Sequence, residues 1–139
     1  YEIEKKLFNG DLAVADLPTA WNTMYESWFG MKVPEDRLGC LQDIHWSMGA
    51  FGYFPTYTLG NLYASQLLEA MRTDLGDIDA LVASGDWTPM LNWLRPRIHQ
   101  RGSQVTPAEL IEDATGHPPS PDPFLNYVEK KYSALYNLD

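Results

Sequence analysis

Signals that start and stop helices recur along the chain, and they constrain its fold more than any other feature of the sequence. Pro lies near the first position of several expected helices, as in Asp16-Leu17-Pro18 and Thr88-Pro89, and Gly follows expected helix ends, as at Gly30 and Gly116. Between these signals apolar residues recur every three or four positions, which is the period of a helix with one buried face. The alternation typical of strands never extends over more than a few residues. The sequence therefore predicts an all-α fold.

The same signals give approximate helix ranges. We expect helices over residues 1–8, 17–29, about 57–72, a short piece after Asp77, 88–98, 107–115, and from Asp122 toward the C-terminus. Thr106-Pro107-Ala108-Glu109 is a complete capping box, which marks the start of one of these helices. Pro96 lies inside the 88–98 pattern and removes a backbone hydrogen bond there, so we expect a kink.

The first expected helix has an end and no beginning. Asn9-Gly10 is a good stop signal, but neither a capping residue nor an initiator Met precedes Tyr1. A processed N-terminus explains this start, and so does a chain that is the tail of something longer.

Length and composition exclude several classes of protein. A chain of 139 residues allows one domain, and 45% apolar residues is ordinary for a globular protein. Ten Lys and Arg against 19 Asp and Glu give a net charge of −9, which argues against nucleic-acid and anionic-membrane partners. No apolar run approaches the ~18 residues that a membrane helix needs. The single cysteine, Cys40, excludes an internal disulfide framework and is typical of a reducing, cytoplasmic compartment.

The segment from Gly39 to Gly60 interrupts the helical pattern. It contains four glycines and one proline, and it gathers aromatic residues beside a Gln, an Asp and His45. An irregular segment of this kind is expected where it lines a site. The alternative is purely structural: His45 would be a buried histidine with satisfied hydrogen bonds, and the larger aromatic residues would belong to the core. Those aromatic residues are Trp46, Phe51 and Phe54.

Motifs for a metal site or a nucleophile are absent or weak. The helical zinc signature His-Glu-x-x-His does not occur, and His45, His99 and His117 are far apart without ligand spacing. One cysteine cannot form a thiolate zinc site, so we expect no metal bound to this chain. Cys40 and His45 allow a thiol nucleophile with its base, but their context matches no nucleophile motif. A buried and unreactive Cys40 is the preferred interpretation.

The irregular segment resembles one family closely. Gly39-Cys-Leu-Gln42-Asp43-Ile-His45-Trp46 matches the G-x-x-Q-D-x-H-W signature of the thermostable, Taq-type metallocarboxypeptidases, and the residues from Tyr53 to Asn61 match the segment that follows it. The resemblance covers essentially the whole chain. Its further matches are Gly10-Asp11, Leu17-Pro18, Trp21-Asn22, Trp93-Leu94, Ile98-His99, Gly102 and Lys131-Tyr132.

The resemblance implies that residues 1–139 are one helical segment from the C-terminal part of a larger, mostly helical zinc-peptidase fold. Members of this family remove single residues from peptide C-termini with broad specificity and are usually homodimers. Their zinc, or another divalent transition metal, is held by residues upstream of the part represented here. The implied partners are a peptide with a free C-terminus, the missing N-terminal part of the enzyme and a second copy. The chain alone is therefore expected to be inactive.

The resemblance also implies roles for individual residues. A zinc peptidase must stabilise the oxyanion of its tetrahedral intermediate, and tyrosine hydroxyl and imidazole N–H groups are suitable donors. By this comparison His45, Tyr53 and Tyr57 are the candidate catalytic residues, and sequence does not separate the roles of the two tyrosines. Gln42 and Asp43 are candidate supporting or substrate-binding residues, with Asp43 orienting the imidazole.

Two alternatives remain open in the sequence. Arg37 is the nearest basic residue that could bind a substrate carboxylate, but the arginine of the family is expected upstream, so Arg37 is not assigned. The alternative function is an autonomous helical module that binds a peptide or a partner in the aromatic segment without catalysis. A His-Glu-x-x-His motif upstream in the gene would favour the enzyme, and a start codon at or just before Tyr1 would favour the module.

Overall fold

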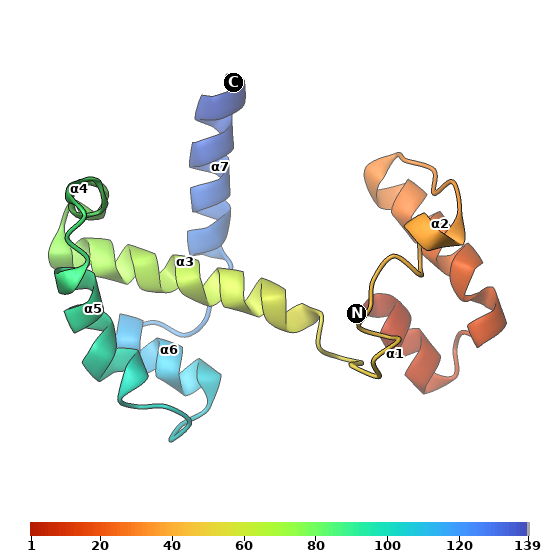
Figure 1. Ribbon diagram of the computed structural model, residues 1–139, viewed down its shortest axis with the longest axis horizontal. Coiled ribbons are helices and arrows are strands. Elements are labelled where there is room, and N and C mark those ends of the chain that lie inside the picture. The colour runs from red at the N-terminus through yellow and green to blue at the C-terminus, as the bar shows by residue number, and fades with distance from the viewer. Residues whose placement is uncertain (139) are drawn as a thin grey trace. The chain divides into compact units, whose positions relative to one another are not determined.

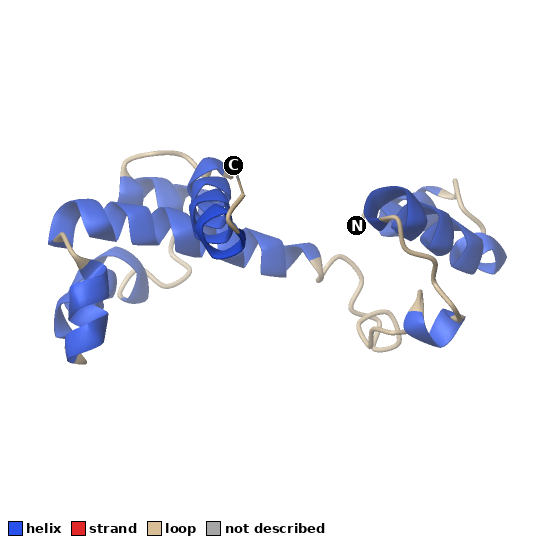
Figure 2. Cartoon of the chain, turned by 90° about the horizontal axis from the view of Figure 1, so that it is seen from above, coloured by secondary structure: helices blue, strands red, loops and turns tan. Residues whose placement is uncertain are grey.

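The computed structural model describes residues 1–138, which form helices joined by loops (Figure 1). The α-helices are α1 (Glu2–Asn9), α2 (Leu17–Phe29), α3 (Pro55–Leu75), α4 (Ile78–Ser84), α5 (Thr88–Leu94), α6 (Pro107–Thr115) and α7 (Asp122–Tyr136). Short 3-10 turns lie at Val14–Asp16 and Asp36–Leu38, and a π-helical turn lies at Arg95–His99. No strand occurs among residues 1–138 (Figure 2), so the predicted all-α class is confirmed.

Most helix ends follow the local signals. Gly30 and Gly116 end α2 and α6 in the left-handed conformation, with φ values of 67° and 79°. At the start of α6 the Glu109 N–H donates to Thr106 Oγ1 at 3.3 Å, and the Thr106 N–H donates to the Glu109 carboxylate at 2.8 Å, which confirms the capping box. Asp16 does not cap α2. The 3-10 turn puts Asp16 in a helical conformation, whereas a capping residue needs an extended one.

Helix α3 is longer than the sequence pattern indicates. It begins at Pro55 and ends at Leu75, whereas the expected range is about 57–72. Pro is well suited to the first turn of a helix because its missing N–H has no partner there. Tyr57 therefore lies in the first turn of α3, and Gly60 lies in the interior of the helix.

The expected break at Pro96 is present. Helix α5 ends at Leu94, and the chain continues as a π-helical turn in which the Gln100 N–H donates to the Arg95 carbonyl at 2.9 Å. Proline has no N–H to donate to the preceding turn, so the regular α-helical hydrogen bonding cannot pass through this position.

The chain consists of two compact units, which we describe separately. Unit 1, from Tyr1 to Thr58, contains α1, α2 and most of the irregular segment. Aromatic contacts join that segment to both helices. Phe8 meets Phe51 with ring centroids 5.1 Å apart, and Trp21 meets Trp46 at 6.0 Å. The buried residues of unit 1 are Ile3, Glu4, Gly39 and Cys40.

Unit 2 begins at Leu59 and has its core between α3, α4 and α5. The buried residues of this core are Met71, Ile78 and Trp93. Asp74 on α3 accepts a hydrogen bond from the Trp93 indole N–H at 2.7 Å and pairs with Arg97 at 3.2 Å. This carboxylate therefore ties α3 to α5 and to the turn that follows it.

A buried glutamine fixes the Pro-rich connection between α6 and α7. Gln66 on α3 is 5% exposed, and its Nε2 donates to Thr115 Oγ1 and to the carbonyls of His117 and Pro118, each at 3.1 Å. Its Oε1 accepts from the Ser120 N–H at 3.0 Å. All polar groups of this buried side chain are thus hydrogen-bonded, as burial requires.

The apolar side chains of α2 and α7, which sequence periodicity marks as buried, are only partly buried or exposed in this chain. Trp28 on α2 is exposed, and no side chain of α7 is buried. The large exposed apolar residues of α7 are Leu125, Tyr127, Tyr132, Leu135 and Tyr136. The helices themselves form as predicted, so what is missing within residues 1–138 is a surface that covers these faces.

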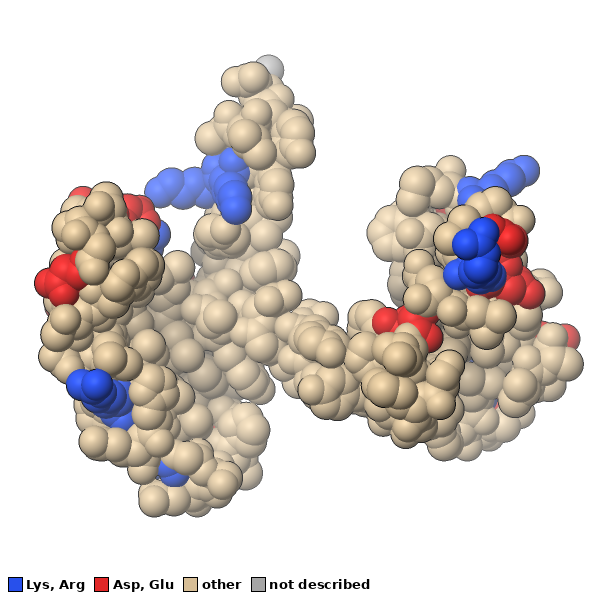
Figure 3. Space-filling view, in the orientation of Figure 1, with Lys and Arg blue, Asp and Glu red and all other residues tan. Residues whose placement is uncertain are grey.

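The distribution of basic side chains and the hydropathy of the helices can be compared with the expectations from composition. Lys and Arg side chains occur in small separate groups on the face shown in Figure 3. In the part of the chain that the structure describes, no helix combines the length and the apolar character needed to cross a membrane.

Candidate functional site

The irregular segment of unit 1 depends on glycine for two different reasons. Gly49 and Gly52 have φ values of 73° and 75°, in the left-handed region that glycine adopts without strain. A Cβ atom at either position would meet nothing within 4 Å. At Gly39, in contrast, a Cβ atom would lie 2.7 Å from Cγ1 of Val33, so this position has no room for a side chain.

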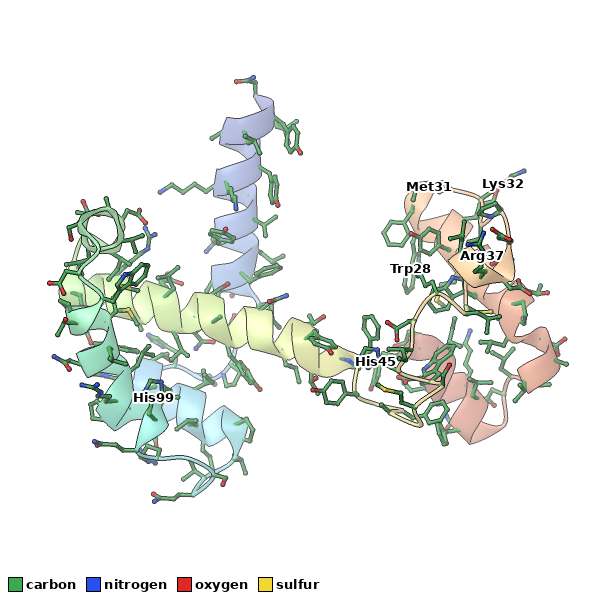
Figure 4. All side chains as sticks on the ribbon, viewed as in Figure 1. Trp28, Met31, Lys32, Arg37, His45 and His99 are labelled. Atoms are coloured by element: carbon green, nitrogen blue, oxygen red, sulfur yellow. The ribbon has the colours of Figure 1, made fainter. Side chains whose placement is uncertain are left out.

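His45 lies among polar and aromatic side chains of the irregular segment (Figure 4). Its backbone N–H donates to Asp43 Oδ1 at 2.7 Å, and its ring atom Nδ1 contacts the same oxygen. The other ring nitrogen, Nε2, lies 3.2 Å from the hydroxyl oxygen of Tyr57. The His45 side chain is only 15% exposed. Both ring nitrogens are therefore held, one by a carboxylate and one by a phenol.

These contacts determine which ring nitrogen of His45 carries the proton. A carboxylate oxygen can only accept, so Nδ1 must donate to Asp43. In the neutral ring Nε2 then has no hydrogen, and it accepts from the Tyr57 hydroxyl. If the ring gains a second proton, Nε2 donates to the Tyr57 oxygen instead, and the Tyr57 hydroxyl proton is free for another acceptor.

The two candidate tyrosines contact His45 in different ways. The Tyr53 ring stacks on the imidazole, with centroids 5.6 Å apart and 19° between the planes. The Tyr57 ring meets the imidazole edge-on. Of the two tyrosines, Tyr57 is the one whose hydroxyl is hydrogen-bonded to the imidazole. Both side chains are about half exposed, Tyr53 at 51% and Tyr57 at 52%. The structure thus distinguishes two tyrosines that sequence alone leaves equivalent.

The remaining residues singled out by sequence lie outside this contact network. Gln42 is exposed and is held through its backbone N–H, which donates to the Gly39 carbonyl at 3.1 Å. Arg37 is also exposed and pairs with its neighbour Glu35. The core interpretation of the aromatic residues is wrong for Phe51 and Phe54, which are both exposed. For Trp46 the core interpretation agrees better with the structure, because this residue is partly buried.

Two titratable groups near this site have shifted pKa values. The hydrogen bond from the His45 backbone N–H is the largest influence on Asp43, and it lowers the pKa of that carboxyl below its ordinary value. Burial raises the pKa of the Cys40 thiol, and the nearby Asp36 carboxylate adds to that effect. Cys40 is 6% exposed, so the thiol is inaccessible and protonated, which is unfavourable for a nucleophile.

Sequence reasoning missed Glu4. This residue of α1 is 5% exposed, and its Oε1 accepts from the Trp46 indole N–H at 2.9 Å and from the Gly52 N–H at 3.0 Å. A signal was available, because Glu4 adjoins Ile3 and lies one turn before Phe8 on the apolar side of α1. A charged residue on an apolar helix face is unusual enough to suggest a specific partner.

Residues 1–138 provide no group of three or more His, Cys, Asp or Glu side chains that could hold a metal ion. The donor set present therefore does not fit a zinc site, which needs at least three protein ligands in one place. What this part of the chain offers is a carboxylate-held imidazole with two phenols, arranged to donate and accept protons.

Comparison with known proteins identifies the family. The model of the carboxypeptidase Taq (M32) metallopeptidase family matches residues 1–132. The chain belongs to this family. The M32 match includes the whole irregular segment and every candidate site residue, so the resemblance seen in the sequence is confirmed.

Individual M32 relatives agree with this assignment. Thermostable carboxypeptidase 1 of Thermus thermophilus is 48% identical over 135 residues, which are 97% of this chain and 26% of the relative. Carboxypeptidase 1 of Bacillus subtilis is 43% identical over 138 residues, 99% of this chain and 28% of the relative. The chain therefore spans about a quarter of the length of the curated relatives that it matches.

Solved M32 structures contain the same helical arrangement. The M32 carboxypeptidase of Deinococcus radiodurans superimposes with a TM-score of 0.93 at 38% identity, covering 99% of this chain and 28% of that one. Metallocarboxypeptidase 1 of Trypanosoma cruzi gives a TM-score of 0.89 at 39% identity, covering 95% of this chain and 28% of the other. The helical piece described here thus matches 28% of each of these larger chains.

Proposed function

We propose that this chain is part of a metal-dependent carboxypeptidase that removes single residues, with broad specificity, from peptide C-termini. The observation that carries the proposal is the His45 ring, held between Asp43 and Tyr57 in a segment that matches the M32 family. We refer below to the longer protein that would contain this chain as the complete enzyme.

In this proposal the chain contributes groups that bind the reacting carbonyl, and other residues of the complete enzyme hold the metal. The metal would polarise the scissile carbonyl, which is its usual contribution in hydrolysis. Residues 1–138 contain no group of side chains that could hold it. The metal ligands are therefore expected outside this chain, and no step is assigned here to a metal bound by it.

His45 and Tyr57 are proposed to act together on the oxyanion of the tetrahedral intermediate. In the neutral ring the Tyr57 proton is directed at Nε2, 3.2 Å away. When the ring is protonated, Nε2 donates to the phenol oxygen, and the Tyr57 hydroxyl can donate to the oxyanion. Asp43 favours this state because its carboxylate accepts from Nδ1 and balances the charge of the imidazolium. A positioned donor of this kind typically contributes about 10²–10³ in rate.

Tyr53 is proposed to make a smaller contribution. Its ring stacks on the imidazole and limits the positions that the His45 ring can adopt. No partner of its hydroxyl is found among residues 1–138, so this hydroxyl remains available to a substrate. Gln42, also exposed, is proposed to contact substrate and not His45.

The proposed partners follow from the same reasoning. The substrate is a peptide with a free C-terminus, and the cation that binds its carboxylate is proposed to lie upstream, as the family resemblance implies. Arg37 is exposed and paired with Glu35, and it is not assigned this role. The remaining part of the complete enzyme is proposed to cover the exposed apolar faces of unit 1. A homodimer is the proposed assembly, without nucleic acid or membrane.

The sequence of the encoding gene tests this proposal. We expect an open reading frame that extends upstream of Tyr1 and encodes His-Glu-x-x-His with a downstream Glu. The complete enzyme should then release single C-terminal residues from a peptide, and a chelator should abolish that activity. A start codon at or just before Tyr1 would reject the proposal in favour of an autonomous peptide-binding module.

A further inference from the structure

The carboxylate of Glu4 joins α1 to two points of the irregular segment. Its Oε1 accepts from the Trp46 indole N–H at 2.9 Å and from the Gly52 backbone N–H at 3.0 Å. These donors lie 42 and 48 residues away in the sequence. One oxygen atom of a helical residue therefore fixes both ends of the 46–52 turn.

The two donors are the immediate neighbours of two candidate catalytic residues. Trp46 directly follows His45, and Gly52 directly precedes Tyr53. The peptide bonds between them are stiff, so a shift of Trp46 or Gly52 must move the neighbouring backbone. We propose that Glu4 is a positioning residue, whose carboxylate sets the places of His45 and Tyr53 within the site. The effect on catalysis rests on the proposed function. The contact of Glu4 with Trp46 and Gly52 does not depend on it.

Burying a carboxylate costs desolvation free energy, so this residue type is an unfavourable choice if its only role is to stabilise the turn. Glu4 is 5% exposed, and its second oxygen, Oε2, is buried without a hydrogen-bond partner among residues 1–138. The amino group of Tyr1 lies 3.7 Å from Oε2, and in the complete enzyme that nitrogen would be an uncharged peptide group. An apolar side chain on this face would avoid the desolvation cost. What it could not do is accept from both donors at once.

The charged form of Glu4 is nevertheless maintained. In this chain burial acts to raise the pKa of this carboxyl, but the hydrogen bonds from Gly52 and Trp46, together with the charged Tyr1 amino group, outweigh it and lower the pKa. Of these influences, the two hydrogen bonds do not depend on a free amino group at Tyr1. The interaction is therefore charge-assisted, which makes it stronger and more directional than a neutral hydrogen bond.

Packing around Glu4 allows its role to be separated from folding. The edge-on contact of Phe8 with Phe51, at 5.1 Å, holds the same turn against α1 without involving the carboxylate. Glu4→Gln keeps an acceptor oxygen in place, whereas Glu4→Met fills the volume and removes the acceptor. Glu2→Gln is the matched control, because Glu2 lies on the same helix with its side chain 49% exposed.

The decisive measurement is kcat and KM of the complete enzyme for each variant. We expect Glu4→Met to lower kcat about tenfold or more with KM changed less than about twofold, because small misplacements of catalytic groups have effects of this size. Glu4→Gln should recover most of the loss, and Glu2→Gln should match the parent. A purely structural role predicts instead that activity falls only in proportion to folded enzyme. Folded Glu4→Met enzyme with unchanged kcat would overturn the proposal.

Two further arms keep the test decisive. Trp46→Phe removes the indole N–H while keeping an aromatic ring, so it should reproduce part of the Glu4→Met effect and should not add to it. In NMR spectra of the 139-residue chain, Glu4→Met should shift the resonances of His45 and Tyr53, and Glu2→Gln should not. Unchanged His45 and Tyr53 resonances would overturn positioning by Glu4. Shifted resonances, together with a complete enzyme that lacks carboxypeptidase activity, would support positioning and reject the proposed function.

Discussion

The hydroxyl of Tyr57 lies 3.2 Å from Nε2 of His45, on the side of the ring opposite the Asp43 contact. Asp43, His45 and Tyr57 therefore form a continuous chain of hydrogen bonds that ends in a half-exposed phenol. A proton added to the ring changes the direction of the bond to Tyr57, because an imidazolium can only donate. The state of the ring thus controls whether the Tyr57 proton is available to a substrate.

Replacing Asp43 tests the assignment of the ring proton. In Asp43→Asn the amide can donate to Nδ1, which would move the ring proton to Nε2 and turn the Tyr57 hydroxyl away. We expect a change of tautomer in the imidazole nitrogen resonances of His45, together with a loss of kcat in the complete enzyme. Glu35→Gln, an exposed carboxylate change in the same unit, is the control. An unchanged tautomer would show that Asp43 does not set the proton position.

The lowered pKa of Asp43 predicts a defined pH dependence. A carboxyl whose pKa is lower in the folded chain stabilises the fold fully above its unfolded pKa, about 3.9 for Asp. That stabilisation is lost as the pH falls through the lowered folded-state pKa. A carboxyl-carbon NMR titration should therefore give Asp43 a midpoint below 3.9. A midpoint at or above that value would contradict the claim that the hydrogen bond from the His45 N–H controls the pKa of Asp43.

The 139-residue chain by itself is expected to be catalytically inactive and to bind zinc no better than a generic acidic protein. The reason is that residues 1–138 hold no group of side chains able to act as zinc ligands. The measurement is zinc content after dialysis, with a C-terminal trimming assay on the same sample. Stoichiometric zinc or released amino acid would contradict the expectation.

Two glycine substitutions should change stability in opposite directions. Gly39→Ala should destabilise the chain by about 1–3 kcal/mol, because its Cβ would lie 2.7 Å from Val33 and force a shift in packing. Gly60→Ala should stabilise it by about 0.5–1 kcal/mol, since Gly60 lies inside α3 with nothing within 4 Å of the added Cβ. Urea unfolding followed by circular dichroism measures both. The same sign for both variants would contradict this reading of the two sites.

Exposed apolar residues at the C-terminal end of α2 and just beyond it predict self-association of the 139-residue chain. Trp28, Phe29 and Met31 are 63%, 59% and 53% exposed, and contiguous apolar surface promotes association. Figure 4 labels Trp28 and Met31 beside the basic residues of the same region. Light scattering from micromolar to millimolar concentration should show dimers or larger species. Trp28→Lys should weaken them and the exposed Ser27→Lys should not. A strictly monomeric chain would count against the prediction.

The sequence predicts local features of this fold well because their causes are local. The Thr106 capping box, the stop at Gly116 and the break at Pro96 each depend on residues within one or two helical turns. The contact between Asp43 and His45 is equally local, since only one residue separates them. The family resemblance implies this contact, and the short spacing makes it possible.

Long-range relationships are the ones that the sequence leaves undetermined. Glu4 and Trp46 meet across 42 residues, and nothing in the local pattern of α1 names that partner. The different contacts that Tyr53 and Tyr57 make with His45 depend on where α3 begins. A start at Pro55 puts Tyr57 in the first helical turn and leaves Tyr53 before the helix. The exposure of Trp28 could not be predicted for a different reason. Periodicity marks a helix face as apolar but does not show which part of the protein covers that face.

The most direct test of the central claim is kcat of the complete enzyme carrying Tyr57→Phe, measured beside its melting temperature. The change deletes one hydroxyl and keeps the ring, so packing is nearly unaffected. We predict a fall in kcat of about 10²–10³ with little change in KM or melting temperature, the pattern of an interaction made mainly in the transition state. His45→Ala should act in the same direction, and Tyr53→Phe should have a smaller effect. A Tyr57→Phe enzyme with near-parental kcat would contradict the account.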